Sequence, residues 1–137
     1  MSTLSVSNIT DGTDTVETGY VVNGSAKAWC NFNVSSGTPV VRNSLNVSSI
    51  TDNGGGWSIP QFTSHFSAAN HATTGSAGKA GGSHSESNSG YVNLSEHSGS
   101  SAGSQTIFTA NLAGSLQDKD HVAFSTHGDL ALSLIHI

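Results

Sequence analysis

Apolar and polar side chains alternate in several short runs of this chain, and Gly, Ser, Asn, Asp or Pro bounds each run. A period of two is typical of a half-buried β-strand, because successive side chains point to opposite faces of the sheet. In the run SAKAWCNFN, one face receives Ala28, Cys30 and Phe32, and the other receives Lys27, Trp29 and Asn31. Helix signals are almost absent, because the abundant Ser, Gly, Thr and Asn are poor in helix interiors. The pattern predicts strands near residues 26–33, 40–50, 57–63, 69–76, 90–96, 105–111 and 121–127.

Strands at such short intervals, with turn residues between them, are typical of an all-β fold. We therefore expect an antiparallel β-sandwich, jelly-roll-like, of about seven strands over residues 25–131. Within it, the run VVRNSLNV is expected to lie in a single strand, with Val41, Leu45 and Val47 on one side. Residues 1–24 are predicted to form an extended stem or linker ahead of the sandwich.

One phrase occurs twice, as VSNITD at residues 6–11 and as VSSITD at residues 47–52, and each copy runs into glycine. Val, Ile and Thr favour a pleated strand, whereas Asp followed by Gly or by Asn-Gly favours the backbone of a tight turn. Each copy is therefore predicted to be the end of a strand followed by a turn. Two copies are too few for a repeat architecture.

The apolar content is low for a chain that folds alone. Leu, Ile, Val and Phe make up 29 of 137 residues, and only 9% of residues are charged. Chains with so few large apolar residues often need a partner, while the low charge argues against a disordered chain. We expect a β domain that completes its burial against other copies of itself.

Trp29 stands on the more polar face of its predicted strand. An outward tryptophan serves either as a platform for a ligand or as a contact with a neighbouring subunit. We favour the subunit contact, because the core is thin and aromatic residues are enriched at interfaces. The predicted interface consists of Lys27, Trp29 and Asn31, with the Lys27 side chain covering the edge of the indole.

Composition and charge argue against several classes of partner. The formal net charge is −5, which is opposite to the basic footprint of a nucleic-acid-binding protein. No segment is long and apolar enough to cross a bilayer, so no membrane insertion is expected. The single cysteine, Cys30, has no partner for an internal disulfide, which favours a reducing compartment of synthesis.

Seven histidines raise the question of a metal site. No two of them stand at i and i+2 on a strand, and no HExxH motif or Cys–His pair is present. His121 and His127 share a face of one predicted strand but lie roughly 20 Å apart. We expect neither a metal site nor a cofactor.

Catalytic motifs are also missing from the sequence. Serines are abundant without a GxSxG elbow, and the glycine-rich segments lack the lysine and following helix of a phosphate loop. Glu86 and Glu96 are the least implausible acids for a glycosidase pair, whose separation a sequence does not show. The chain is therefore predicted to have no enzymatic activity. The Ser- and Gly-rich segments 75–90 and 97–104 are predicted to be loops, of the kind that often carries recognition.

The last six residues, LSLIHI at 132–137, form the most apolar hexapeptide of the chain. They resemble the in-frame translation of a transposon-end adapter used in sequencing libraries, and we expect them to be a non-native tail. The alternative is a genuine last strand.

Three segments occur in the order VVNGSAKAWCNFN, RNSLNVSSITDNGGG and FSAANHATTGSAG. In this order they resemble a family of marine bacteriophage virion proteins, the tail-fibre or tail-spike-like structural proteins. The resemblance covers most of residues 4–77, and its most specific element is the run Ala26 to Asn33. Pro60 departs from the family pattern, and we expect an edge or bulged strand there, because proline cannot donate a ladder hydrogen bond. Residues 78–118 match poorly.

The resemblance implies a homotrimeric fibre-tip or collar domain, assembled in the host cytoplasm and displayed on the virion. We therefore expect a non-enzymatic structural module that contacts other tail proteins and, through several weak contacts, a glycan of the host surface. Two alternatives stay open. One is a carbohydrate-binding or adhesin module that uses Trp29, Trp57, Tyr20 and Tyr91, and the other is a polysaccharide-degrading tail spike. No receptor-contacting residue is identified.

Overall fold

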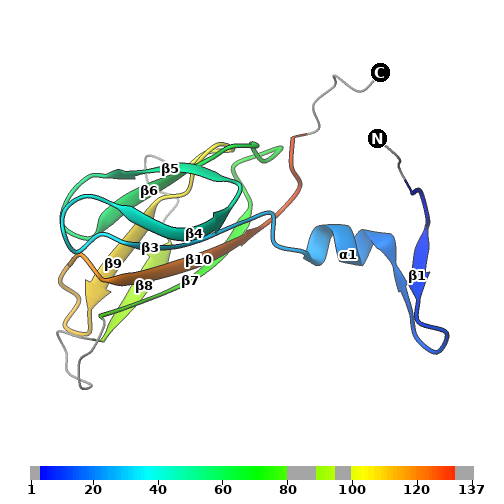
Figure 1. The fold of residues 1–137 in the computed structure, drawn as a ribbon, viewed down its shortest axis with the longest axis horizontal. Helices are drawn as coiled ribbons and strands as arrows, with labels where there is room; N and C mark the ends of the chain where they lie inside the picture. The colour runs from blue at the N-terminus through cyan, green and yellow to red at the C-terminus, as the bar shows by residue number, and fades with distance from the viewer. Residues whose placement is uncertain (1–3, 80–88, 95–99, 132–137) are drawn as a thin grey trace.

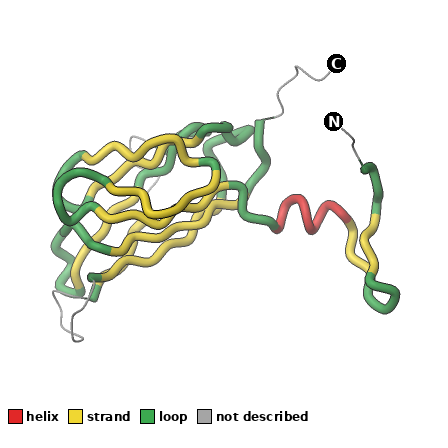
Figure 2. Tube along the Cα trace, viewed as in Figure 1, coloured by secondary structure: helices red, strands yellow, loops and turns green. Residues whose placement is uncertain are grey.

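The computed structural model describes residues 4–79, 89–94 and 100–131. In this part the chain forms ten strands and one short helix (Figures 1 and 2). The elements are β1 Asn8–Thr10, β2 Thr15–Glu17, α1 Thr18–Gly24, β3 Ala28–Asn33, β4 Val40–Leu45, β5 Val47–Asp52, β6 Trp57–Phe62, β7 Ala72–Gly78, β8 Gly90–Leu94, β9 Ile107–Asn111 and β10 His121–His127.

Strands β3 to β10 form the predicted antiparallel β-sandwich. One sheet has the strand order β4-β3-β10-β7, and the other has the order β5-β6-β9-β8. The first and last strands of the sandwich, β3 and β10, lie side by side in the middle of one sheet (Figure 1).

The prediction of about seven strands was wrong, because the sandwich contains the eight strands β3 to β10. The segment 40–50, expected as a single strand, is two strands that belong to different sheets. Asn46 separates them with a φ of 57°, the left-handed conformation that asparagine tolerates better than most residues. Its side-chain amide donates to the carbonyl of Ser64 at 2.9 Å and accepts from the Ser64 backbone N–H at 2.6 Å. The chain therefore turns a corner from one sheet to the other at Asn46.

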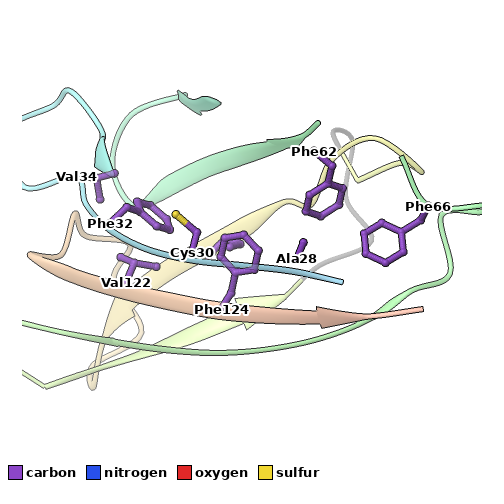
Figure 3. Close-up of a cluster of buried hydrophobic side chains, with 9 residues drawn as sticks. Ala28, Cys30, Phe32, Val34, Phe62, Phe66, Val122 and Phe124 are labelled. Atoms are coloured by element: carbon purple, nitrogen blue, oxygen red, sulfur yellow. The ribbon is translucent and has the colours of Figure 1, made fainter. Parts of the chain in front are cut away.

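The core lies between the two sheets, and the period-two pattern locates it correctly (Figure 3). Along β3 the residues alternate between buried and half-buried, with Ala28, Cys30 and Phe32 inside. The cluster also takes side chains from β6, β9, β10 and the adjoining loops, namely Val34, Phe62, Phe66, Ile107, Val122 and Phe124. Several buried neighbours are polar, including Thr106, Thr109 and Thr126, so the apolar layer is thin, as expected.

Both copies of the repeated phrase behave as predicted. VSNITD includes β1 and leads through a turn into β2, while VSSITD is β5 and leads through a turn into β6. The aspartate organises each turn in the same way. The carboxylate of Asp11 accepts from the N–H of Thr13 at 2.9 Å, and that of Asp52 accepts from the N–H of Gly54 at 2.7 Å. The following glycines, Gly12 and Gly54, have positive φ.

We expected Pro60 to lie on an edge strand or on a bulged strand. The expectation of an edge strand was wrong. Strand β6 lies between β5 and β9, and the register shift occurs in its partner β5, between Val47 and Ser49. The ladder from β6 to β9 contains only the pairs Trp57–Phe108 and Ser58–Ile107. It ends before Pro60, whose carbonyl accepts from the N–H of Gln105 at 3.1 Å. The missing proline donor therefore falls where the ladder is already irregular.

Residues 4–24 form an arm outside the sandwich (Figure 1). We expected this segment to be extended, but β1 and β2 form a hairpin and residues Thr18–Gly24 form the helix α1. The helix has no side-chain N-cap, no acidic residue in its first turn and no basic residue in its last turn. Tertiary contacts rather than local sequence signals therefore have to support it.

Candidate functional site

The predicted interface residues Trp29 and Asn31 share the outer face of the sheet β4-β3-β10-β7. Both are half-buried and alternate with the core residues of β3. Trp29 lies between Leu45 of β4 and Ser125 of β10 in the strand register. Because Leu45 is 48% exposed, the indole has an apolar neighbour that water still reaches.

Asn31 belongs to a small polar network on the same face. Its side-chain oxygen accepts from Nη1 of Arg42 at 3.1 Å. The same nitrogen lies 3.4 Å from Nδ1 of His121, across β3 on β10. Arg42 reaches this position because the register between β3 and β4 shifts between Asn31 and Phe32, which leaves Arg42 as an extra residue.

The Lys27 side chain was predicted to cover the edge of the Trp29 indole, but its ammonium binds backbone carbonyls. Its ammonium donates to the backbone carbonyls of Val22 and Ser25, at the C-terminal end of α1. Its backbone N–H donates to the carbonyl of Thr126 at 2.9 Å. A cation at this end of a helix is favourable because the last carbonyls carry partial negative charge. Lys27 therefore joins the arm to the sandwich.

Most of the exposed large apolar side chains of the described structure lie in two places, and three others, Tyr91, Leu112 and Leu116, lie elsewhere. The first is the arm, and the second is strand β4 beside Trp29. They are Leu4, Val6, Ile9, Val16, Tyr20, Val21 and Val22 in the arm, and Val40, Val41 and Leu45 in β4. No residue of α1 is buried.

Two cavities lie at the junction of the arm and the sandwich, and they share Ser67 and Asp129. The first has a volume of about 440 Å³ and is lined by Asn23, Phe66, Ser67, Ala68, Asn70, His71, Gly128 and Asp129. The second has a volume of about 560 Å³ and is lined by Val22, Lys27, Ser67, Asp129 and Leu130. We call the two together the junction cavity. Sequence reasoning missed it, because its lining comes from three segments that only the fold brings together.

His71 forms one wall of the junction cavity. Its ring contacts Phe66 with a centroid distance of 4.7 Å and meets Phe62 edge-on at 5.6 Å. Phe62 and Phe66 themselves pack at 5.0 Å and lie side by side at one end of the core cluster (Figure 3). Nε2 of His71 lies 3.1 Å from the carbonyl oxygen of Ser101. The imidazole is thus held in one orientation by packing and by a hydrogen bond.

The other sequence-based candidates are spread over the molecule. Tyr20 lies in α1, Trp29 in β3, Trp57 in β6 and Tyr91 in β8, so no two of these aromatic rings share an element. Trp57 packs against Phe108 at a centroid distance of 5.6 Å. Glu86 and Glu96 lie outside the described residues, as do 80–88 and 97–99 of the two predicted loops. Of the described parts, 75–78 is the end of β7 and Gly90 begins β8, whereas 100–104 lies outside the strands, as predicted.

The described residues contain no group of three or more His, Cys, Asp or Glu side chains that could hold a metal ion. Their single helix is too short to cross a membrane. Cys30 is buried in β3, and burial raises the pKa of its thiol to about 11. A thiol with such a high pKa is a poor nucleophile at neutral pH.

A comparison of the chain with protein-family models, with curated proteins and with solved structures yields no match. The resemblance to tail-fibre proteins therefore stays a prediction.

Proposed function

We propose that this chain is a non-enzymatic structural module of a phage tail fibre, in which the sandwich forms a tip or collar and the arm continues into the stem. The chain assembles as a homotrimer in the host cytoplasm and is displayed on the virion. There it contacts other tail proteins and the host surface. The order of the three motifs from residue 21 to residue 78 supports the family, and the shape of the chain supports the role.

One observation carries the proposal: the apolar side chains of the arm stay exposed in the part of the chain that the structure describes. Tyr20 is 72% exposed and Val22 is 56% exposed, in a helix of seven residues without a buried side chain. Isolated helices this short are unstable in water, and their stability normally comes from packing of an apolar face. A second and a third copy of the same arm offer that packing, as strands and helices do along a fibre stem.

The outer face of the sheet gives a second apolar surface for assembly. Trp29 and Leu45 are neighbours in register, and Val40 is 54% exposed further along the same strand as Leu45. Aromatic anchors surrounded by polar residues are the usual centre of a protein interface. In the trimer, this face is expected to lie against a sister chain.

The oligomeric state of the full chain tests the proposal directly. Sedimentation velocity over a range of concentrations is expected to show a trimer for the natural sequence. Tyr20→Ser is expected to shift the distribution towards monomer, because the side chain lies in the arm. Leu112→Ser is the matched control, because Leu112 is also exposed, at 59%, but lies in the turn between β9 and β10.

A folded monomer of the natural sequence at every concentration would contradict the proposal. Trp29→Ser, checked for folding by circular dichroism, separates the two surfaces. A trimer that survives this substitution but not Tyr20→Ser is held by the arm alone.

A further inference from the structure

The two long sides of the sandwich differ in how their outer strands meet. On one side the outer strands are β7 and β8, which are joined by a bridge between Gly78 and Ser89. They pack so closely that a β-carbon at Gly75 would lie 3.1 Å from Cγ1 of Val92. On the other side the outer strands are β4 and β5, and within the described residues no bridge links these two. We call this second side the open side.

The open side exposes apolar side chains that face the interior of the sandwich. Val41 of β4 lies opposite Phe32 in the register, and Ile50 of β5 lies opposite Pro60. Residues directly opposite each other share a face of the sheet, and Phe32 and Pro60 are buried. Val41 and Ile50 therefore point into the layer between the sheets. Val41 is nevertheless 42% exposed, and Ile50 is only half-buried.

Strand β4 is poorly suited to accept a further strand on this side. Arg42 is an extra residue in its ladder with β3, and a bulge with a charged side chain is a common protection of a sheet edge. The backbone N–H of Ser44 donates to Oδ1 of Asn43 at 2.9 Å. A side chain of β4 itself thus occupies a donor that an added strand would need.

Strand β5, in contrast, presents backbone groups that a further strand can use. The carbonyl of Pro60 accepts from the N–H of Gln105, so it points away from β5. The pair Ile50–Pro60 is then one without hydrogen bonds between its strands, and the N–H and C=O of Ile50 point to the outer side of β5. No strand of the described part pairs with that side. The register shift of β5 lies before Ile50, between Val47 and Ser49.

Strand β1 of the arm has the properties of a strand that fits this edge. It is uncharged, and its phrase VSNITD repeats the phrase VSSITD of β5, with Ile9 in the position of Ile50. Ile9 is 46% exposed, and β1 pairs only with β2 among the described strands. An isolated two-stranded hairpin is at best marginally stable in water. The arm lies outside its own sandwich (Figure 1), so the β5 edge that β1 can join belongs to another copy.

We propose that β1 of one copy adds to the outer side of β5 in a neighbouring copy, with Ile9 turned towards Ile50 and the open side. Backbone hydrogen bonds give the contact its affinity, as in other cases of strand addition, and burial of Ile9 adds to it. The inference rests on the proposed assembly of sister chains and specifies the contact. Each chain donates one strand and accepts another, and such a head-to-tail contact can close into a ring of three. Pairing of β5 with β5 would give only two-fold dimers.

Residue-resolved amide hydrogen exchange of the full chain, followed by ¹H–¹⁵N NMR, tests the contact. In the dilute monomer the amide of Ile50 points to water and is expected to exchange fast. The amide of Thr51 points to β6 and is expected to exchange slowly, which makes it an internal reference. At concentrations where the chain assembles, exchange at Ile50 is expected to slow by about tenfold or more. Fast exchange at Ile50 in the assembled chain would overturn the proposal.

Ile9→Lys and Leu4→Lys are matched variants of the arm. The first places a charge against the apolar open side, so it is expected to restore fast exchange at Ile50 in the concentrated sample. The second adds the same charge at a residue that is 85% exposed and lies outside β1, and it is expected to keep Ile50 protected. Neither residue belongs to the sandwich, whose own slow amides report that it stays folded. Equal protection of Ile50 in the two variants would contradict the role of Ile9.

A synthetic peptide of residues 4–12 separates this outcome from that of the assembly experiment. If the full chain stays a monomer, the trimer is contradicted, but an excess of the peptide is still expected to protect the amide of Ile50. A trimer in which Ile50 exchanges fast contradicts the strand contact and leaves the proposed structural role standing. A monomer in which the peptide does not protect Ile50 contradicts both proposals.

Discussion

Nδ1 of His127, the last residue of β10, lies 3.1 Å from the carbonyl oxygen of Gly24, the last residue of α1. The carbonyl accepts, so Nδ1 donates, and the end of the sandwich thereby holds the end of the helix. Lys27 adds a second contact, because its ammonium binds the carbonyls of Val22 and Ser25. Two residues outside the arm thus bind carbonyls at the end of a helix whose last turn has no basic residue of its own.

Lys27→Met is expected to loosen α1 without affecting the sandwich. Methionine keeps much of the aliphatic stem but removes the charge that interacts with the helix end, an interaction that contributes roughly 0.3–1 kcal/mol. Hydrogen exchange of the backbone amides in residues 18–25 should become faster, while exchange in β3 and β10 stays slow. Lys79→Met is the control, because Lys79 is exposed at the far end of β7. Equal exchange in both variants would show that Lys27 does not hold the helix.

Asn46→Ala is expected to lower the free energy of unfolding by roughly 2–3 kcal/mol. The loss has two parts: alanine is strained at a φ of 57°, and both side-chain hydrogen bonds to Ser64 disappear. Asn46→Gly removes only the second part and should be about 1 kcal/mol less destabilising. Urea denaturation of the two variants checks this order. If both lose the same amount, the left-handed backbone at the corner contributes nothing to the effect.

Thr106 and Thr109 are both buried, but their hydroxyl groups differ in hydrogen bonding. The hydroxyl of Thr109 donates to the carbonyl of Gln117 at 2.7 Å, whereas that of Thr106 has no hydrogen-bond partner. Thr106→Val should therefore raise the free energy of unfolding by roughly 1 kcal/mol, and Thr109→Val should lower it by a similar amount. Thermal unfolding of the two variants measures both signs. A loss of stability in both would mean that the Thr106 hydroxyl is satisfied in solution.

Cys30 is expected to resist alkylation until the protein unfolds. Burial raises the pKa of its thiol from about 9 to about 11, so the native chain has almost no thiolate at neutral pH. Between about pH 9 and 11 the unfolded chain has released the thiol proton while the native chain still holds it. Stability therefore falls as the pH rises through this window.

A thiol reagent added at pH 8 to native and to urea-unfolded protein measures the reactivity. Denaturation at several alkaline pH values, compared with Cys30→Ala, measures the linkage. The alanine variant should lack this part of the decline. Fast labelling of the native chain would contradict the buried position of Cys30.

The all-β class of the fold could be predicted from the sequence, because an alternation of apolar and polar residues indicates the two-residue period of a β-strand. The alternation in residues 28–33 identified the buried face of β3 correctly, and the repeated Asp-containing phrase identified two turns correctly. Both features depend on residues close together in the sequence, for which side-chain direction and turn chemistry are local properties.

Only the tertiary structure decided where the chain changes sheets and which polar groups meet. The corner at Asn46 interrupts an apolar pattern without a Gly or Pro, and its partner Ser64 lies 18 residues away. The helix α1 has no side-chain N-cap, and two residues outside the arm, Lys27 and His127, bind carbonyls at its C-terminal end. The cavity around Asp129 likewise joins segments that lie far apart in the sequence, namely 22–27, 66–71 and 128–130. Local periodicity thus determined which residues face inward, whereas long-range packing determined the corner, the arm and the site.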